Sequence, residues 1–273
     1  MMMKVSVVIP TYKPGNYLQD CLQSLENQTL SKDQYEVIVV LNGCADPWKQ
    51  QVEEWLSECT MSSVFIHTET PGVCHARNMG IEQAQGEYLV FVDDDDWVSE
   101  NFLRGMLGHA SPDTVVTSSV IGYRDATGEY LADYYLARKF NRICMEGGKA
   151  SINQGRSFLS SSCFKLIPRS VIGTRRFNPR YKLGEDALFM AELTDRISFV
   201  EMSEPDAVYY RRLRDGSASH TMGRTAFPRL LWNAVSLSGS YMKVYLRKPF
   251  RYNCAFFATR IMAGFTKRLF CYN

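Results

Sequence analysis

The sequence lacks the usual marks of a secreted or membrane-spanning protein. Its 273 residues include 8 Cys, which are scattered without a CxxC pair or the spacing of a disulfide framework. The first residues run directly into a short strand pattern that contains Pro10, so no secretory signal is expected. No apolar stretch is long enough to be a clear membrane span. We therefore expect a cytoplasmic protein with reduced thiols.

Acidic residues are almost missing from the last part of the chain. Residues 211–273 contain 12 Lys and Arg but only one acid, Asp215. The remainder holds 19 basic and 28 acidic residues, so its net charge is −9 whereas that of the last part is +11. This asymmetry predicts an acidic body and a tail that meets anions.

Short apolar runs alternate with helical patterns over the first hundred residues. The runs are rich in β-branched residues, as buried strands are, and the segments between them have apolar residues at helical spacing. The expected strands are 5–9, 35–41, 63–67 and 88–92, and the expected helices are 17–28, 47–59 and 75–85. This alternation predicts an α/β fold with a mostly parallel sheet flanked by helices.

The alternation loosens after about residue 110. We expect one further strand over 114–123, an irregular segment over 130–155 and a helix over 183–196. From residue 226 the pattern is helical to the end, with a break at Pro249. The sequence thus predicts a helical C-terminal extension behind the sheet.

Four consecutive aspartates, Asp93–Asp96, follow the last of the four early strands. Carboxylates at the mouth of a buried strand repel one another and resist desolvation. A divalent cation such as Mg²⁺ or Mn²⁺ would compensate, because hard cations take carboxylate oxygen; the alternative is a solvated acidic loop. Residues 10–12 and 41–43 follow two other strands at the same edge, where ligands of parallel sheets bind.

Five motifs occur in order along the chain. They occupy residues 5–12, 37–43, 72–81, 91–96 and 184–186. Together they resemble the family 2 glycosyltransferases of GT-A fold, whose sheet is Rossmann-like and mostly parallel with flanking helices. The resemblance implies an inverting, metal-dependent enzyme that uses a nucleotide-activated sugar.

The aspartate run corresponds to the Asp-x-Asp-Asp pattern of that family. By resemblance, Asp93 faces the ribose or the sugar and is a candidate metal ligand, and Asp95 ligates Mn²⁺ or Mg²⁺. The four-fold run leaves the register open by one residue, so Asp94 and Asp96 remain candidates; the alternative for these two is exposure to solvent.

The turn after the first strand holds the nucleoside in the family, which makes Pro10, Thr11 and Tyr12 candidate donor-binding residues. Tyr12 could stack on a base, or it could pack on the edge of the sheet. Asn42 departs from the family, which commonly has an Asp that accepts the uracil N–H. Because Asn accepts as well as donates, it could still hold the base.

Arg77 lies at the start of an expected helix, within the third motif. A helix N-terminus attracts anions, and a guanidinium would add a contact to the diphosphate. The alternative is an ion pair between Arg77 and the aspartates that pre-positions them. The sequence does not separate the two.

The pair Glu185 and Asp186 supplies the second set of carboxylates. By resemblance Asp186 is the base that deprotonates the acceptor hydroxyl, with Glu185 as a helper; acidic residues in a first turn can also simply stabilise a helix. Residues 209–220 resemble the family's flexible loop, whose arginines could close on the diphosphate. His220 in that loop is a further candidate metal ligand, or an exposed histidine.

The tail places apolar residues 257, 261, 265 and 269 on one helical face among basic residues. This pattern favours adsorption to an anionic membrane at its cytoplasmic face. The alternatives are docking on the enzyme body or in a homodimer.

The resemblance divides the chain into three parts. These are a nucleotide-sugar-binding half over 1–110, an acceptor-binding half with the base and the flexible loop over 111–225, and the basic helical tail over 226–273. The expected reaction moves a hexose or N-acetylhexosamine from a UDP-sugar to a glycan or lipid-linked acceptor in surface polysaccharide synthesis. We expect no nucleic-acid partner. The alternatives are a metal-dependent phosphoryl-transfer enzyme and a non-catalytic nucleotide- or glycan-binding module.

Overall fold

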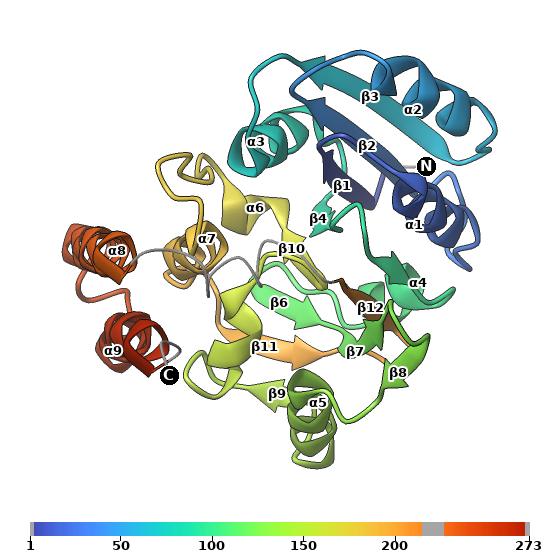
Figure 1. Ribbon diagram of the computed structural model, residues 1–273. Coiled ribbons are helices and arrows are strands. Elements are labelled where there is room, and N and C mark those ends of the chain that lie inside the picture. The colour runs from blue at the N-terminus through green and yellow to red at the C-terminus, as the bar shows by residue number, and fades with distance from the viewer. Residues whose placement is uncertain (1–2, 215–226, 271–273) are drawn as a thin grey trace.

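A computed structural model describes residues 3–214 and 227–270 of the chain. Its centre is an eight-stranded sheet whose first four strands are parallel (Figure 1). In spatial order these are β3 (Ser62–Thr68), β2 (Tyr35–Asn42), β1 (Val5–Thr11) and β4 (Tyr88–Phe91). Every residue of β1 and β2 is buried, as expected of parallel strands covered on both faces, and the four predicted strands are confirmed.

Three helices connect these strands, as the sequence predicts. They are α1 (Asn16–Glu26), α2 (Trp48–Ser57) and α3 (Val73–Gln83). The chain steps from β1 to β2 to β3 in one direction across the sheet and then returns to β4. With right-handed crossovers, α1 and α2 therefore lie on one face of the sheet and α3 on the other.

The second half of the sheet is built from later residues. Strand β10 runs antiparallel to both β4 and β6, and β11 is parallel to β6. The strands are β10 (Lys165–Pro168), β6 (Thr114–Thr117), β11 (Phe199–Met202) and β9 (Lys149–Ala150). Strands from residues 1–110 and from residues 111–225 thus share one sheet and one core.

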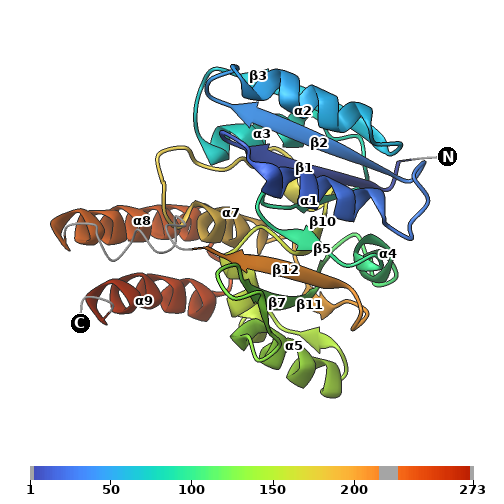
Figure 2. The same cartoon turned by 45° about the vertical axis from the view of Figure 1, so that its right-hand side comes forward.

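A second sheet of four strands lies beside α1 (Figure 2). Its strands in spatial order are β5 (Trp97–Val98), β12 (Val208–Leu213), β7 (Ser119–Arg124) and β8 (Glu129–Leu131). The prediction of a single strand over 114–123 was therefore wrong. The chain leaves the large sheet after β6, passes through the buried Ser118 and enters the small sheet as β7, a change that hydrophobic pattern alone cannot show.

The segment expected to be irregular contains a helix, α5 (Tyr135–Met145). Leu136, Phe140 and Ile143 are buried on one side of it, while the charged residues between them face solvent. Because aromatic and charged residues dominate this segment, its helical period was missed. The remaining short helices of this part are α4 (Phe102–Leu107), η1 (Gln154–Ser160) and α6 (Arg169–Ile172).

The predicted C-terminal helices are confirmed, with the break near Pro249. After α7 (Glu185–Leu193), α8 (Phe227–Arg247) and α9 (Cys254–Phe270) run side by side, and α8 packs against α7 (Figures 1 and 2). Phe257, on the predicted apolar face of the last helix, is 3% exposed and packs against Tyr241 and Tyr252, which agrees with docking of that helix on the protein. No helix within the described ranges is long and apolar enough to cross a bilayer.

Candidate active site at the carboxyl edge of the sheet

Three neighbouring parallel strands end at one edge of the sheet. β1 ends at Thr11, β2 ends at Asn42, and one residue separates the end of β4 from Asp93. Because β1 pairs with both β2 and β4, these three ends lie next to one another (Figure 1). The expected clustering of the early motifs at this edge is therefore confirmed.

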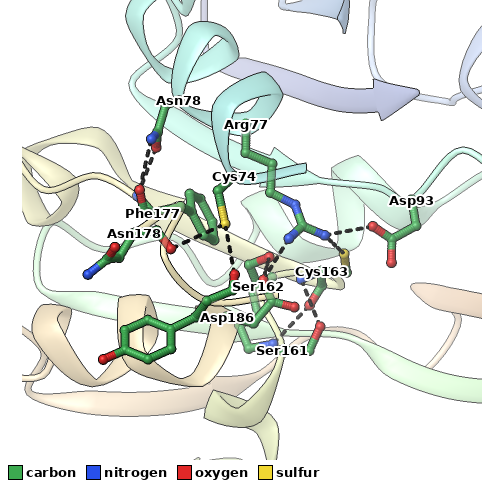
Figure 3. A network of polar contacts seen from close by, with 12 residues as sticks. Cys74, Arg77, Asn78, Asp93, Ser161, Ser162, Cys163, Phe177, Asn178 and Asp186 are labelled. Carbon is green, nitrogen blue, oxygen red and sulfur yellow. Dashed lines mark hydrogen bonds and ion pairs between the residues drawn. The ribbon is translucent and has the colours of Figure 1, made fainter. Parts of the chain in front are cut away.

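Arg77 of α3 joins the two sets of carboxylates that lie far apart in the sequence. Its guanidinium donates to Asp93 Oδ1 and to Asp186 Oδ1, each at 2.8 Å (Figure 3). One planar cation thereby holds together the aspartate loop after β4 and the start of α7.

The surroundings of Arg77 strengthen this bridge. Arg77 is 3% exposed, and its guanidinium lies 5.4 Å from the ring centre of Phe177. Burial lowers the pKa of Arg77, but Asp186 and Asp93 raise it by more, so the group stays charged. The contact seen is thus the aspartate pairing that the sequence offered as one of two interpretations; contact with a diphosphate stays a prediction.

Each of the four aspartates has a different partner. Asp93 accepts from Arg77, and Asp94 accepts a 2.5 Å hydrogen bond from the hydroxyl of Thr11. Asp95 forms an ion pair with Arg214. The run is therefore not a row of equivalent carboxylates, because the fold assigns each one to a separate element.

The burial of Asp96 rules out the alternative that this fourth aspartate is exposed to solvent. It is 4% exposed, and its carboxylate accepts from the Tyr209 hydroxyl at 2.6 Å and from the Arg212 backbone N–H at 2.8 Å. The same Tyr209 oxygen accepts from the backbone N–H of Asp93. Asp96 therefore anchors β12 beneath the loop.

The aspartate loop carries a strong electrostatic conflict. Burial and the neighbouring carboxylates Asp95 and Asp93 raise the pKa of Asp94 to about 7, although the hydrogen bond from Thr11 opposes this. Burial and Asp93 also raise the pKa of Asp95, and burial raises that of Asp96 well above its usual range. Negative charge at this edge is incompletely neutralised by the protein's own cations.

The residues present suit a divalent cation that a ligand helps to hold. Within residues 3–214 and 227–270, no three His, Cys, Asp or Glu side chains converge to form a metal site by themselves. Mg²⁺ and similar ions in phosphate sites commonly use one or two protein carboxylates together with phosphate oxygens and water. Asp93 and Asp95 are partly exposed carboxylates with one residue between them, and they could supply the protein ligands of such an ion.

The second carboxylate pair begins α7. Gly184 precedes it with φ of 88°, a left-handed conformation that favours glycine. Asp186 Oδ1 accepts from both Arg77 and the Ser162 hydroxyl, at 2.8 and 2.9 Å, whereas its Oδ2 has no hydrogen bond within the described residues. Burial and the adjacent Asp186 raise the pKa of Glu185 to about 7. The pair thus offers one fixed carboxylate with a free oxygen.

Of the candidate residues at the ends of β1 and β2, Tyr12 is exposed and Asn42 is buried. Tyr12 is 53% exposed and its ring lies beside Gly43, where a Cβ would approach the ring to 2.7 Å. The side chain of Asn42 is buried; it donates to Thr11 O and accepts from Gly72 N–H, each at 2.7 Å. Asn42 therefore ties β1 to the start of α3, which the sequence did not indicate.

Pro10 and Thr11 also lie within the strand itself. Pro10 is a buried residue of β1, so its side chain is not exposed and only the main chain at this position could contact a ligand. Thr11 is 1% exposed and uses its hydroxyl to hold Asp94. His220, the remaining candidate ligand, lies outside the described residues.

Sequence reasoning missed several residues of the site. Ser162, which contacts Asp186, belongs to none of the motifs, and Tyr209, which contacts Asp96, lies in the segment 209–220 but was not itself a candidate. Arg212 donates to the main-chain oxygen of Asp95 at 2.9 Å. Only the arginine-rich stretch at the end of β12 carried a signal, and it gave no indication of which arginine meets which aspartate.

The arrangement of strands and helices matches that of solved GT-A glycosyltransferases, which defines the class of fold. The structure resembles S. aureus TarS 1–349 in complex with UDP-GlcNAc, with a TM-score of 0.69, 22% identity, and coverage of 99% of this chain and 74% of that one. It also resembles the mannosyltransferase PcManGT from Pyrobaculum calidifontis in complex with GDP-Man and Mn²⁺, with a TM-score of 0.68, 16% identity, and coverage of 100% and 72%.

The family follows from the sequence match. The model of the family described as Glycosyl transferase family 2 matches residues 6–173, more than half of the chain. The chain therefore belongs to glycosyl transferase family 2. This membership confirms the resemblance and favours sugar transfer over the phosphoryl-transfer alternative.

Curated relatives agree with the family. The glycosyltransferase GlyA of Streptococcus pneumoniae is 27% identical over 227 residues, which are 79% of this chain and 31% of GlyA. EpsH of Bacillus subtilis is 38% identical over 176 residues, 64% of this chain and 49% of EpsH. The chain thus spans half or less of the length of these two relatives.

The bridge by Arg77 predicts a large loss of stability when it is removed. Arg77→Met should lower the free energy of unfolding by about 3 kcal/mol or more, because two partly buried carboxylates lose their shared cation. Arg124→Met, which breaks the exposed pair with Glu129, should cost about 1 kcal/mol or less. Urea denaturation measures both; similar losses in the two variants would contradict the bridge.

The conflict at Asp94 predicts an unusual pH dependence. Because the folded state keeps this proton to a higher pH than the unfolded chain, the contribution of Asp94 to the unfolding free energy should fall as pH rises from about 4 to about 7. Between pH 5 and 8 in EDTA, wild type should lose on the order of 2 kcal/mol more than Asp94→Asn. Asp133→Asn, at a carboxylate 81% exposed, should behave as wild type. Equal losses in wild type and Asp94→Asn would refute the conflict.

Proposed function

We propose that the protein is an inverting glycosyltransferase that moves a hexose or N-acetylhexosamine from a UDP-sugar to a glycan or lipid-linked acceptor in surface polysaccharide synthesis. The observation that carries the proposal is the Arg77 bridge, which sets Asp93 of the donor edge beside Asp186. The likeness to S. aureus TarS in complex with UDP-GlcNAc supports a uridine donor, and relatives named for poly(ribitol-phosphate) glycosylation support a surface polymer.

Asp186 is the base in this proposal. Its Oδ2 takes the proton of the acceptor hydroxyl as that oxygen attacks the anomeric carbon. Arg77 and Ser162 bind Oδ1, so they fix the direction of the carboxylate while leaving the other oxygen free. Glu185, whose pKa is raised to about 7, lies next to it and can hold an acceptor hydroxyl through a hydrogen bond.

The donor binds at the ends of β1, β2 and β4 in this proposal. The exposed ring of Tyr12 stacks on the base, and Thr11, Asn42 and the main chain at Pro10 shape the nucleoside turn. Asp93 and Asp95 would be the protein ligands of Mn²⁺ or Mg²⁺. The positive charge of the ion would lower the raised pKa of the neighbouring Asp94. A divalent ion held there would neutralise charge that develops on the leaving diphosphate.

We also propose contact with the cytoplasmic face of an anionic membrane, through α8 rather than α9. Trp232, Val235, Met242 and Leu246 share one face of α8 and are each at least 47% exposed, and Phe250 at the turn is fully exposed. Basic residues near the same end of the helix are Lys243, Arg247, Lys248 and Arg251. Exposed apolar side chains bordered by cations suit an anionic lipid surface, where a lipid-linked acceptor would be found.

Sugar transfer can be tested by nucleotide release. With Mn²⁺ and a panel of UDP-sugars and GDP-sugars, wild type should release nucleotide, and EDTA should abolish the release. Asp186→Asn keeps a side-chain oxygen that accepts the hydrogen bonds of Arg77 and Ser162, but it removes the base. Turnover should therefore fall by about 100-fold or more while UDP affinity changes little. Glu185→Gln should cost less. A large loss of UDP binding in Asp186→Asn would overturn the assignment of the base.

Membrane contact can be tested by cosedimentation with liposomes. The double variant Trp232→Gln with Leu246→Gln should bind phosphatidylglycerol liposomes more weakly than wild type does, and added salt should weaken the binding of both. Met145→Gln, at an exposed apolar residue of α5, serves as the matched control and should bind as wild type. The proposal fails if the wild-type protein ignores these liposomes.

A further inference from the structure

A groove of about 710 Å³ lies outside the site described above, between α1 and the outer face of the small sheet. One wall is formed by residues of β5, β7, β8 and β12, and the other by the polar side of α1. Figure 2 shows β5 and β12 below α1, with β7 beside β12. None of the proposed catalytic or donor-binding residues lines this groove.

The sheet wall is made of four aromatic rings. Strand register pairs Trp97 with Tyr210 and Tyr123 with Tyr130. Trp97 and Tyr210 are stacked, with ring centres 5.3 Å apart and planes 14° apart, and Tyr123 lies 5.0 Å from both Trp97 and Tyr130. The rings therefore form one continuous surface.

This aromatic surface is not explained by the core. Side chains alternate along strands, and the inward positions of the same strands, Val98, Val120 and Tyr209, are buried. On the outward side Tyr130 is 55% exposed, whereas an outward sheet face is ordinarily polar. An exposed aromatic patch in a groove indicates a binding surface.

The opposite wall and the rim supply hydrogen-bonding groups. Asp20, Gln23 and Asn27 line the groove from α1, and Glu100 and Asp206 line its end. The carboxylates here accept hydrogen bonds, and the amides both accept and donate. Flat apolar rings that face carboxylates and amides suit a sugar ring, which presents C–H groups on its face and hydroxyls around its edge.

The charge of the groove selects against anions. The lining contains three carboxylates and one cation, Arg212. That guanidinium is already bound to Asp20 at 2.8 Å and to Asp125 at 2.9 Å, and it lies 4.7 Å from the ring centre of Trp97. A phosphate-bearing polymer would meet net negative charge here, so a neutral ligand is favoured.

We propose that this groove binds an uncharged oligosaccharide, with sugar faces on the rings of Trp97, Tyr123, Tyr130 and Tyr210 and hydroxyls on the side chains of α1. Arg212 connects the groove to the aspartate loop, because it also donates to the main-chain oxygen of Asp95. The idea that the bound glycan is a remote part of the acceptor chain rests on the proposed function. Binding of a neutral glycan does not.

The test is direct binding on an array of neutral and anionic oligosaccharides, in EDTA and without a sugar nucleotide. Wild type should bind neutral glycans, and Tyr130→Ala should weaken binding about tenfold or more. Tyr135→Ala is the matched control, because Tyr135 is a tyrosine of similar exposure on α5 outside the groove, and it should bind as wild type. Both variants should keep the circular dichroism spectrum of the wild type.

Three results on the array would overturn the proposal. They are no binding of any neutral glycan by wild type, equal binding by Tyr130→Ala and wild type, and a preference for phosphorylated or sulfated glycans. A dimer in sedimentation that Tyr130→Ala dissociates would instead assign the groove to a second copy of the chain, and it would also overturn the proposal. The array contains neither sugar nucleotide nor divalent metal, so its results do not depend on whether the protein transfers a sugar.

Discussion

The geometry of the site depends on one buried cation shared by two carboxylates. Arg77 reaches from the first turns of α3 to Asp93 and Asp186, which are 93 residues apart in the sequence, and holds both at 2.8 Å. A buried guanidinium is costly unless its donors are used, and these carboxylates are costly without a partner. The two problems solve each other only if the donor edge and the start of α7 meet. The same contact keeps Asp186 oriented for its proposed role.

Pairing with neighbouring groups also holds the aspartate loop, but it neutralises the carboxylates there less completely. Thr11, Arg214 and Tyr209 bind the carboxylates of Asp94, Asp95 and Asp96 respectively, yet the pKa values of these three aspartates remain raised. The fold thus stores negative charge where the proposed donor and its cation would bind. Such an arrangement lowers the stability of the protein alone in exchange for affinity toward a divalent ion.

Away from this edge, two surfaces expose aromatic or apolar side chains. The outward side of the small sheet is aromatic although the core does not need it, and α8 presents apolar side chains although α9 packs against it. The sequence placed the amphipathic face in the last helix, where the pattern is clear. The structure buries Phe257 of that helix and leaves Trp232 and Leu246 exposed, because packing of two helices uses one face of each.

The sequence by itself determined the first four strands and their helices, the edge at which their loops meet, the family, and Asp93–Asp96 as an unusual concentration of charge. These follow from local periods and from motifs within a few residues. It did not determine that Asp96 would be buried, that residues 114–123 would divide between two sheets, or that Asn42 would bind Gly72. Those outcomes, like the partnership of Arg77 with Asp186, depend on which distant residues come into contact, and only the packed tertiary structure decides that.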